Sequence, residues 1–163
     1  MKLYLVRHAE AVERSPAVAE EQRWLTTAGR RSFRANARLL ARKKLRPDLI
    51  LTSPLVRAIQ TAEILAEALQ YEGELAMAAE AAPGFDLRQL TMLLARYPAV
   101  RRLVVVGHEP DLGALAGVLL GREVAVPLKK GMIIALKLGA AAMGAASFRW
   151  LVHNGEKIDR LGE

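Results

Sequence analysis

Histidine and arginine side chains stand where three apolar runs of the sequence end. Arg7-His8 follows the first run, Arg57 lies about one helical turn beyond the second, and His108 follows a later run. An imidazole nitrogen can act as a nucleophile, a base or a metal ligand, while a guanidinium group binds phosphate or carboxylate oxygens with forked hydrogen bonds. Together, these residue types predict a site for an anionic group.

The same residues favour phosphoryl transfer over metal binding. The sequence contains no Cys and no His-x-His or His-Glu-x-x-His spacing. Fixed guanidinium charges repel a metal cation, but they match the oxygens of a phosphoryl group. They also disfavour protonation of a nearby imidazole, and a neutral imidazole can attack phosphorus directly. The pattern therefore predicts covalent catalysis by a histidine, with no metal ion and no cofactor.

An alternation of strand-like and helix-like segments must position these residues. Strands are expected over 3–6, 48–52, 75–79, 103–106, 132–138 and 147–152, with 139–146 as a hairpin connection. Helices are expected from Thr26 or Thr27 to about residue 44, from Ser53-Pro54, with Ser53 as the N-cap, to about residue 70, and over 85–97 and 109–120.

Repeated strand-helix-strand units predict a three-layer α/β fold with a mainly parallel sheet. Ligands bind at the carboxyl ends of parallel strands, so the three apolar runs should bring His8, Arg57 and His108 to one edge. In the last helix, Gly113 and Gly117 recur at four-residue spacing, which we expect to allow close packing against the sheet.

Composition limits the class of protein. The 163 residues, 52% of them hydrophobic, predict one domain over 1–163. The net charge of +7 is consistent with an anionic partner. The arginines of the helix after Thr26 are expected to form a solvated face, and no aromatic residues alternate with them, so no nucleic-acid partner is expected.

Lys137 interrupts the longest apolar region, and the N-terminus lacks a signal-peptide core. We therefore expect no membrane span and a cytoplasmic location. The oligomeric state stays open.

Four ordered motifs resemble those of the histidine phosphatase (phosphoglycerate mutase-like) superfamily. They are Leu5-Val6-Arg7-His8-Ala9-Glu10, Leu25-Thr26-x-x-Gly29, Ser53-Pro54 with Arg57-Ala58-x-Gln60-Thr61-Ala62, and Val106-Gly107-His108-Glu109-Pro110. The resemblance implies a phosphoglycerate mutase-like fold and His8 as the nucleophile. It also implies that Arg7 and Arg57 bind the phosphoryl group and that His108 completes the pocket.

The small size, the short insertions and Lys130-Gly131 are most similar to SixA-type phosphohistidine phosphatases. Those enzymes remove phosphate from a histidine on a phosphotransfer protein. The resemblance thus implies a phosphorylated protein as the partner. Two alternatives stay open: a phosphatase or mutase acting on a small phosphorylated molecule, and a phosphate-binding module without catalytic activity.

Two further residues are candidates for substrate contacts. Superfamily members that release an alkoxide use a carboxylic acid as proton donor, and Glu80 after the third strand is the candidate, with Glu10 and Glu109 as alternatives. Glu80 could equally be a surface carboxylate. Arg23 is either an additional phosphate contact or an exposed structural arginine. No motif surrounds His153, which is expected to be structural or exposed.

Overall fold

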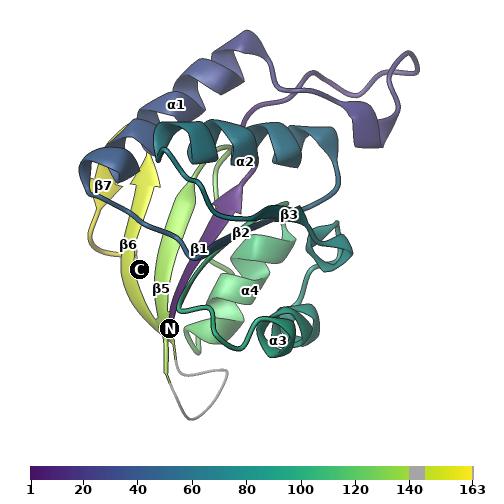
Figure 1. Ribbon diagram of the computed structural model, residues 1–163. Coiled ribbons are helices and arrows are strands. Elements are labelled where there is room, and N and C mark those ends of the chain that lie inside the picture. Colours follow the sequence, from purple (N-terminus) through teal and green to yellow (C-terminus); the bar gives the residue numbers. More distant parts are fainter. Residues whose placement is uncertain (140–145, 163) are drawn as a thin grey trace.

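The computed structural model describes residues 1–139 and 146–162, in which one mixed sheet is covered by helices on both faces (Figure 1). The strands are β1 (Lys2–Arg7), β2 (Leu49–Thr52), β3 (Leu75–Met77), β4 (Arg102–Gly107), β5 (Ile133–Leu138), β6 (Ala146–His153) and β7 (Glu156–Ile158). The α-helices are α1 (Thr27–Arg42), α2 (Val56–Ala68), α3 (Leu87–Arg96) and α4 (Asp111–Leu119), and two 3-10 helices are η1 (Glu20–Gln22) and η2 (Ala79–Ala81).

The sheet has a parallel half and an antiparallel half. Its strand order is β3-β2-β4-β1-β5-β6-β7, and β1 to β4 pair in parallel with one another. β5, β6 and β7 each pair antiparallel. The three-layer α/β fold is confirmed, but the sheet is mixed: β5 runs antiparallel to β1, and the connections that lead to β6 and β7 are too short for a parallel crossover. β7 was not predicted, since its three residues are all exposed. Most of the expected hairpin connection, 140–145, lies outside the described residues.

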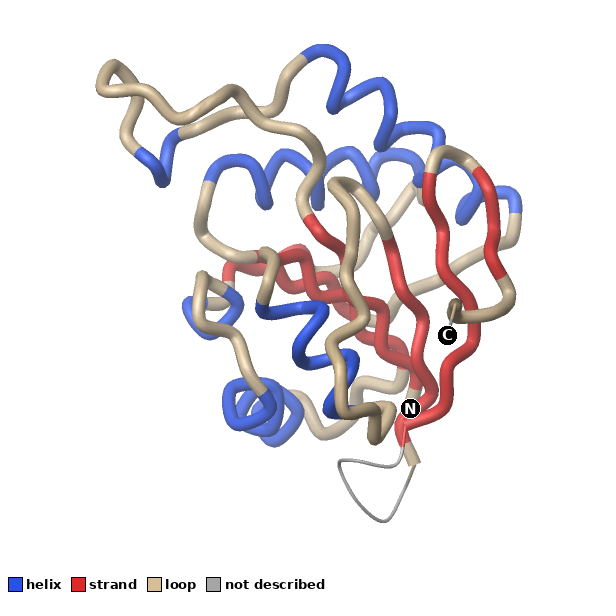
Figure 2. The backbone as a smooth tube through the Cα atoms, turned by 180° about the vertical axis from the view of Figure 1, so that it is seen from behind, coloured by secondary structure: helices blue, strands red, loops and turns tan. Residues whose placement is uncertain are grey.

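Helices cover the two faces of the sheet in pairs, α1 and α2 on one side and α3 and α4 on the other (Figures 1 and 2). Successive side chains of β1 enter the two cores alternately: Leu3 and Leu5 pack toward α3 and α4, whereas Tyr4 and Val6 pack toward α1 and α2. β1 and β4 are therefore apolar on both faces, which explains the continuous apolar runs in the sequence.

The start of α2, which lies next to the candidate site, differs from the sequence prediction. Thr26 caps α1 as predicted, and its side chain accepts a hydrogen bond from the Gly29 N–H. The prediction that Ser53 caps the next helix is wrong, because α2 begins only at Val56. The Ser53 hydroxyl instead accepts the Leu55 N–H at 3.2 Å, which forms a turn between β2 and α2.

The glycines of α4 contact a different part of the chain from the one we expected. A Cβ atom on Gly113 would lie 2.6 Å from the Val126 carbonyl oxygen, and one on Gly117 would lie 2.6 Å from that of Val124. The close approach is therefore that of residues 124–126 and not of the sheet. Beyond residue 126 the chain returns to the carboxyl edge of the sheet, where Leu128 and the residues after it lie.

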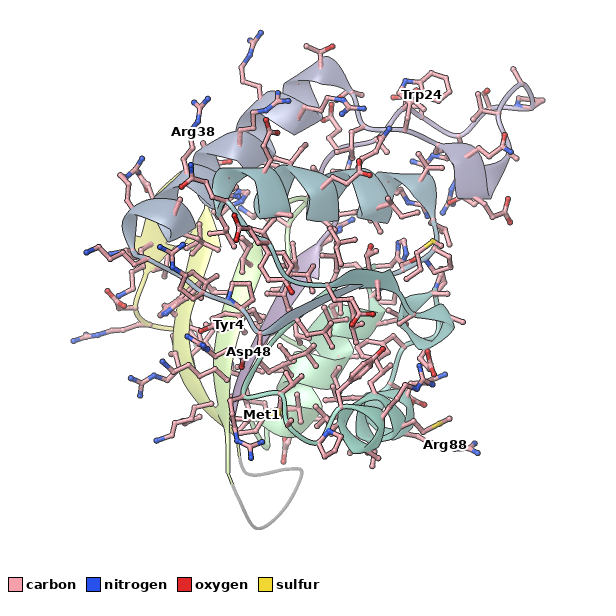
Figure 3. The ribbon with its side chains drawn as sticks, viewed as in Figure 1. Met1, Tyr4, Trp24, Arg38, Asp48 and Arg88 are labelled. Carbon is pink, nitrogen blue, oxygen red and sulfur yellow. The ribbon has the colours of Figure 1, made fainter. Side chains whose placement is uncertain are left out.

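The arginines of α1 form an exposed face. Arg31, Arg34, Arg38 and Arg42 are all exposed, and Arg38 points away from the sheet (Figure 3). No helix in the two described ranges is long and apolar enough to cross a membrane.

Candidate active site

Three strand ends meet at the carboxyl edge of the parallel half of the sheet. Arg7 pairs in register with Gly107, and the His8 N–H donates to the Gly107 carbonyl at 3.0 Å. The Ser53 N–H donates to the carbonyl of Val106 at 2.9 Å. This arrangement places the rings of His8 and His108 5.2 Å apart, centre to centre.

The edge holds a cavity of about 720 Å³ that these side chains line. Arg7, His8, Arg57 and His108 all contribute to it, and so does Arg23. The segment between β1 and α1, which carries η1, also lines the cavity, through Glu13, Arg14, Glu20 and Arg23. Within the described parts of the chain, no group of three or more His, Asp or Glu side chains is arranged to hold a metal ion.

His8 is held in the tautomer that a nucleophile needs. Its Nδ1 lies 2.7 Å from the Ala9 carbonyl oxygen, so Nδ1 carries the proton and the lone pair is on Nε2. Burial lowers the pKa of His8 to about 3; the hydrogen bond to Ala9 opposes this shift, while His108, Arg57 and Arg7 add to it. The ring is therefore neutral at physiological pH.

The peptide after His8 is fixed by α2. The Ala9 N–H donates to Thr61 Oγ1 at 3.0 Å, and the Thr61 hydroxyl donates to the Arg57 carbonyl at 2.7 Å. One turn of α2 thus connects the peptide that follows His8 to Arg57. On the other side, Gly131, with φ of +73°, donates its N–H to the His8 carbonyl at 3.0 Å.

Two arginines are oriented by main-chain carbonyls. Nη1 of Arg7 donates to the Leu128 carbonyl at 2.8 Å, and Nη1 of Arg57 donates to the Glu20 carbonyl at 2.8 Å. The Nε atoms of both arginines are buried without a hydrogen-bond partner in the described structure. Leaving a buried donor unpaired costs about 1–3 kcal/mol, so both arginines retain an unused capacity to donate hydrogen bonds, and both line the cavity.

His108 adds a third donor of this kind. Its Nε2 lies 2.7 Å from the Ser53 hydroxyl, whose lone pair already accepts the Leu55 N–H. A second lone pair of this hydroxyl stays free, but the buried Ser53 proton has no other acceptor among the described residues, so it donates to Nε2. The proton of His108 is then on Nδ1, which is buried and has no partner in the same part of the chain. Burial lowers the pKa of His108 to about 4, with the charge of Arg57 as the next cause.

Arg23 lies in the cavity wall, but its hydrogen bonds are to the protein. Nε donates to the Val12 carbonyl at 2.8 Å, and Nη1 donates to the Glu20 carboxylate at 3.0 Å. The structure therefore brings Arg23 to the candidate site, where Glu20 already binds one edge of its guanidinium group.

Glu80 is not brought to the cavity. It lies in η2 and forms an ion pair with Arg96 of α3. A hydrogen bond from its own backbone N–H, followed by the interactions with Arg96, holds the pKa of Glu80 below its usual range, so it is a poor proton donor. Glu10 accepts the Thr26 hydroxyl. Of the three candidate carboxylates, Glu109 alone lines this cavity, and burial raises its pKa.

Known proteins share both the sequence and the fold. A family model for the histidine phosphatase superfamily (branch 1) matches residues 3–80. An uncharacterized protein of Picosynechococcus is 38% identical over 149 residues, which are 89% of this chain and 90% of that protein. The chain belongs to the histidine phosphatase superfamily. It is a phosphatase.

Relatives within the superfamily include SixA proteins. Phosphohistidine phosphatase SixA of Escherichia coli is 26% identical over 152 residues, 92% of each chain. A structure of the protein histidine phosphatase SixA complexed with tungstate superposes with a TM-score of 0.84 at 25% identity, covering 94% of this chain and 97% of that one. A mycobacterial glucosyl-3-phosphoglycerate phosphatase shares the fold, with a TM-score of 0.63 at 22% identity over 83% and 89% of the chains.

In this phosphatase, the sequence did not reveal the residues that hold the candidate catalytic groups. Ser53 was expected to cap a helix, and Glu20 belongs to no motif. Thr61 had a detectable signal, because it follows Arg57 by four residues and so lies on the same face of α2. Leu128 acts through its carbonyl oxygen, which every residue type provides.

Proposed function

We propose that the protein hydrolyses phosphohistidine on a phosphorylated protein, without a metal ion, through a phosphohistidine intermediate on His8. The observation that carries the proposal is that His8, whose Nε2 is unprotonated, lines one cavity together with three hydrogen-bond donors, Arg7, Arg57 and His108. Such donors suit the three equatorial oxygens of a phosphoryl group in transfer.

In the first step, His8 Nε2 attacks phosphorus as the bond from phosphorus to the leaving imidazole breaks. The leaving nitrogen keeps the electron pair of that bond and takes a proton from solvent. Arg7, Arg57 and His108 donate hydrogen bonds to the phosphoryl oxygens throughout. In the second step, water attacks phosphorus, inorganic phosphate leaves, and the electron pair returns to Nε2. His8 is thereby regenerated in its neutral form.

Two considerations support a protein substrate. Glu80, the expected proton donor, lies outside the cavity lining, although Glu109 is part of it, and an imidazole leaving group needs less protonation than an alkoxide. The SixA proteins to which the chain is similar act, by name, on phosphohistidine. The second candidate is a small phosphorylated molecule, which a cavity of about 720 Å³ is large enough to hold.

The deciding experiment compares kcat/KM for a phosphohistidine-containing protein, p-nitrophenyl phosphate and 3-phosphoglycerate, each with and without EDTA. We expect the phosphoprotein to be the best substrate and EDTA to have no effect. Faster turnover of 3-phosphoglycerate would favour the second candidate, and a loss of activity in EDTA would refute metal independence.

Trapping the intermediate tests the nucleophile. Rapid quenching with radiolabelled substrate should give acid-labile, base-stable phosphate on the wild-type chain. The His8→Asn variant should give none and should not turn over. His153→Asn is the matched control and should trap phosphate normally, because His153 does not line the cavity. Binding of phosphate without hydrolysis by the wild type would instead indicate a phosphate-binding module.

A further inference from the structure

A carboxylate lies among the arginines of the candidate phosphate site. Glu20 Oε1 accepts hydrogen bonds from Arg57 Nη2 at 3.0 Å and from Arg23 Nη1 at 3.0 Å. Its Oε2 lies 3.2 Å from Nε of Arg14. One side chain thus pairs with three cations, two of which are largely buried.

The carboxylate is not needed to orient Arg57. The main-chain carbonyl of Glu20 already binds Nη1 of Arg57 at 2.8 Å. Arg7 is held by one carbonyl in the same way, and no salt bridge to Arg7 is found in the described residues. The distinctive contribution of the Glu20 side chain at this site is therefore its negative charge.

That charge is present at physiological pH. Partial burial acts to raise the pKa of Glu20, but the hydrogen bond and charge of Arg23, together with Arg57 and Arg14, outweigh it and hold the pKa below its usual range. The negative charge of Glu20 also acts on His108, another residue of the cavity lining, because it partly opposes the lowering of the pKa of His108.

We propose that Glu20 is a resident counter-anion that competes with phosphate for Arg57 and Arg23, and so weakens the binding of the product phosphate. The inference rests on the proposed function in one respect, that Arg57 binds the phosphoryl group. Glu20 binds the Nη1–Nη2 end of Arg57, whereas Nε, on the adjacent edge, has no partner among the described residues. Phosphate can therefore bind Arg57 while Glu20 remains beside it, where two like charges repel.

The consequence is faster product release. A dianion bound among the five cationic side chains that line the cavity, Arg7, Arg14, Arg23, Arg57 and Lys130, would leave slowly. A fixed negative charge beside Arg57 raises the free energy of the bound phosphate dianion and so favours its release. Glu20 would thus weaken the binding of phosphate in the ground state and increase the rate of turnover.

The test is the affinity of the full-length protein for orthophosphate, measured by isothermal titration calorimetry. Glu20→Gln removes the charge but keeps an oxygen that accepts from Arg57 and Arg23. We expect the Kd for phosphate to fall about tenfold in this variant, on the scale of one unit charge removed from a partly exposed site. The matched control is Glu13→Gln: Glu13 lines the same cavity but is exposed and forms no salt bridge in the described structure, so its Kd should change less than about twofold.

A second variant separates competition from positioning. Glu20→Ala removes the hydrogen bonds as well as the charge. If Glu20 served to position Arg57, Glu20→Ala would bind phosphate more weakly than the wild type and Glu20→Gln would match it; either result overturns the proposal. Circular dichroism melting of each variant confirms that it is folded. If Arg57→Met binds phosphate as well as the wild type, the proposed role of Arg57 in phosphate binding is wrong. If instead the Kd for phosphate is unchanged in Glu20→Gln, the proposal for Glu20 is wrong and the role of Arg57 is unaffected.

Discussion

The burial of two neutral histidines should make the protein less stable as the pH falls from about 7.5 to about 5. His8 and His108 have pKa values of about 3 and about 4 in the folded protein, against 6.5 for an unperturbed histidine. Between these limits the unfolded chain binds protons that the folded chain does not. Stability from both groups is therefore fully present above pH 6.5 and is lost progressively as the pH falls toward the folded pKa values.

The size of the loss follows from the same values. At about pH 5, each histidine is almost fully protonated in the unfolded chain and almost fully neutral in the folded one. Each then lowers the free energy of unfolding by about 2 kcal/mol, and the pair by about 4 kcal/mol. Carboxylates with lowered pKa values, such as Asp48 and Glu20, lose their contribution mainly at lower pH, whereas Glu109, whose pKa burial raises, acts against the two histidines as the pH falls.

Urea unfolding at the two pH values measures the loss. The wild type should lose about 4 kcal/mol and His8→Asn about 2 kcal/mol, because only one of the two buried histidines then titrates. His153→Asn is the control, since His153 is less buried than either and should leave most of the difference in place. An equal pH difference in the wild type and His8→Asn would refute the conclusion that His8 is held neutral by its surroundings.

Three substitutions test two residues near the candidate catalytic histidines and the candidate proton donor Glu80. Ser53→Ala removes the partner of His108 Nε2, and kcat/KM for a phosphohistidine substrate should fall roughly tenfold, with Ser53→Thr closer to the wild type. Thr61→Val leaves the buried Ala9 N–H without its acceptor; urea unfolding should show a loss of about 1–3 kcal/mol that Thr61→Ser largely restores. Glu80→Gln should lower kcat/KM for p-nitrophenyl phosphate by less than about threefold, because its carboxylate lies outside the cavity lining; a loss of about 100-fold would show that it is a general acid after all.

The strand ends could be predicted from the sequence because their signal is local. An apolar run that stops at Arg7-His8 or at His108 marks both a buried strand and the residues at its carboxyl end. The rule that parallel strands present these ends at one edge then predicts which residues gather there. The pairing of β1 with β4 supports that inference directly.

The partners of these residues could not be predicted in the same way. The main-chain carbonyls of Glu20 and Leu128 orient the two arginines. Because every residue type has such a carbonyl, the sequence does not mark these two positions. Glu80 pairs with an arginine 16 residues away, and nothing in the local sequence of either shows that they meet. The antiparallel half of the sheet was underestimated because its last strand is short and exposed.

The position of β1 inside the sheet has a consequence for synthesis on the ribosome. β1 leaves the ribosome first, but its neighbours are β4 and β5, which begin about a hundred residues later. At roughly 5–20 residues per second, the strand that delivers His8 waits on the order of ten seconds for both partners. During that interval its apolar side chains and its backbone hydrogen-bonding groups are open to other nascent chains or to chaperones. His8 is thus made well before the strands that complete its surroundings.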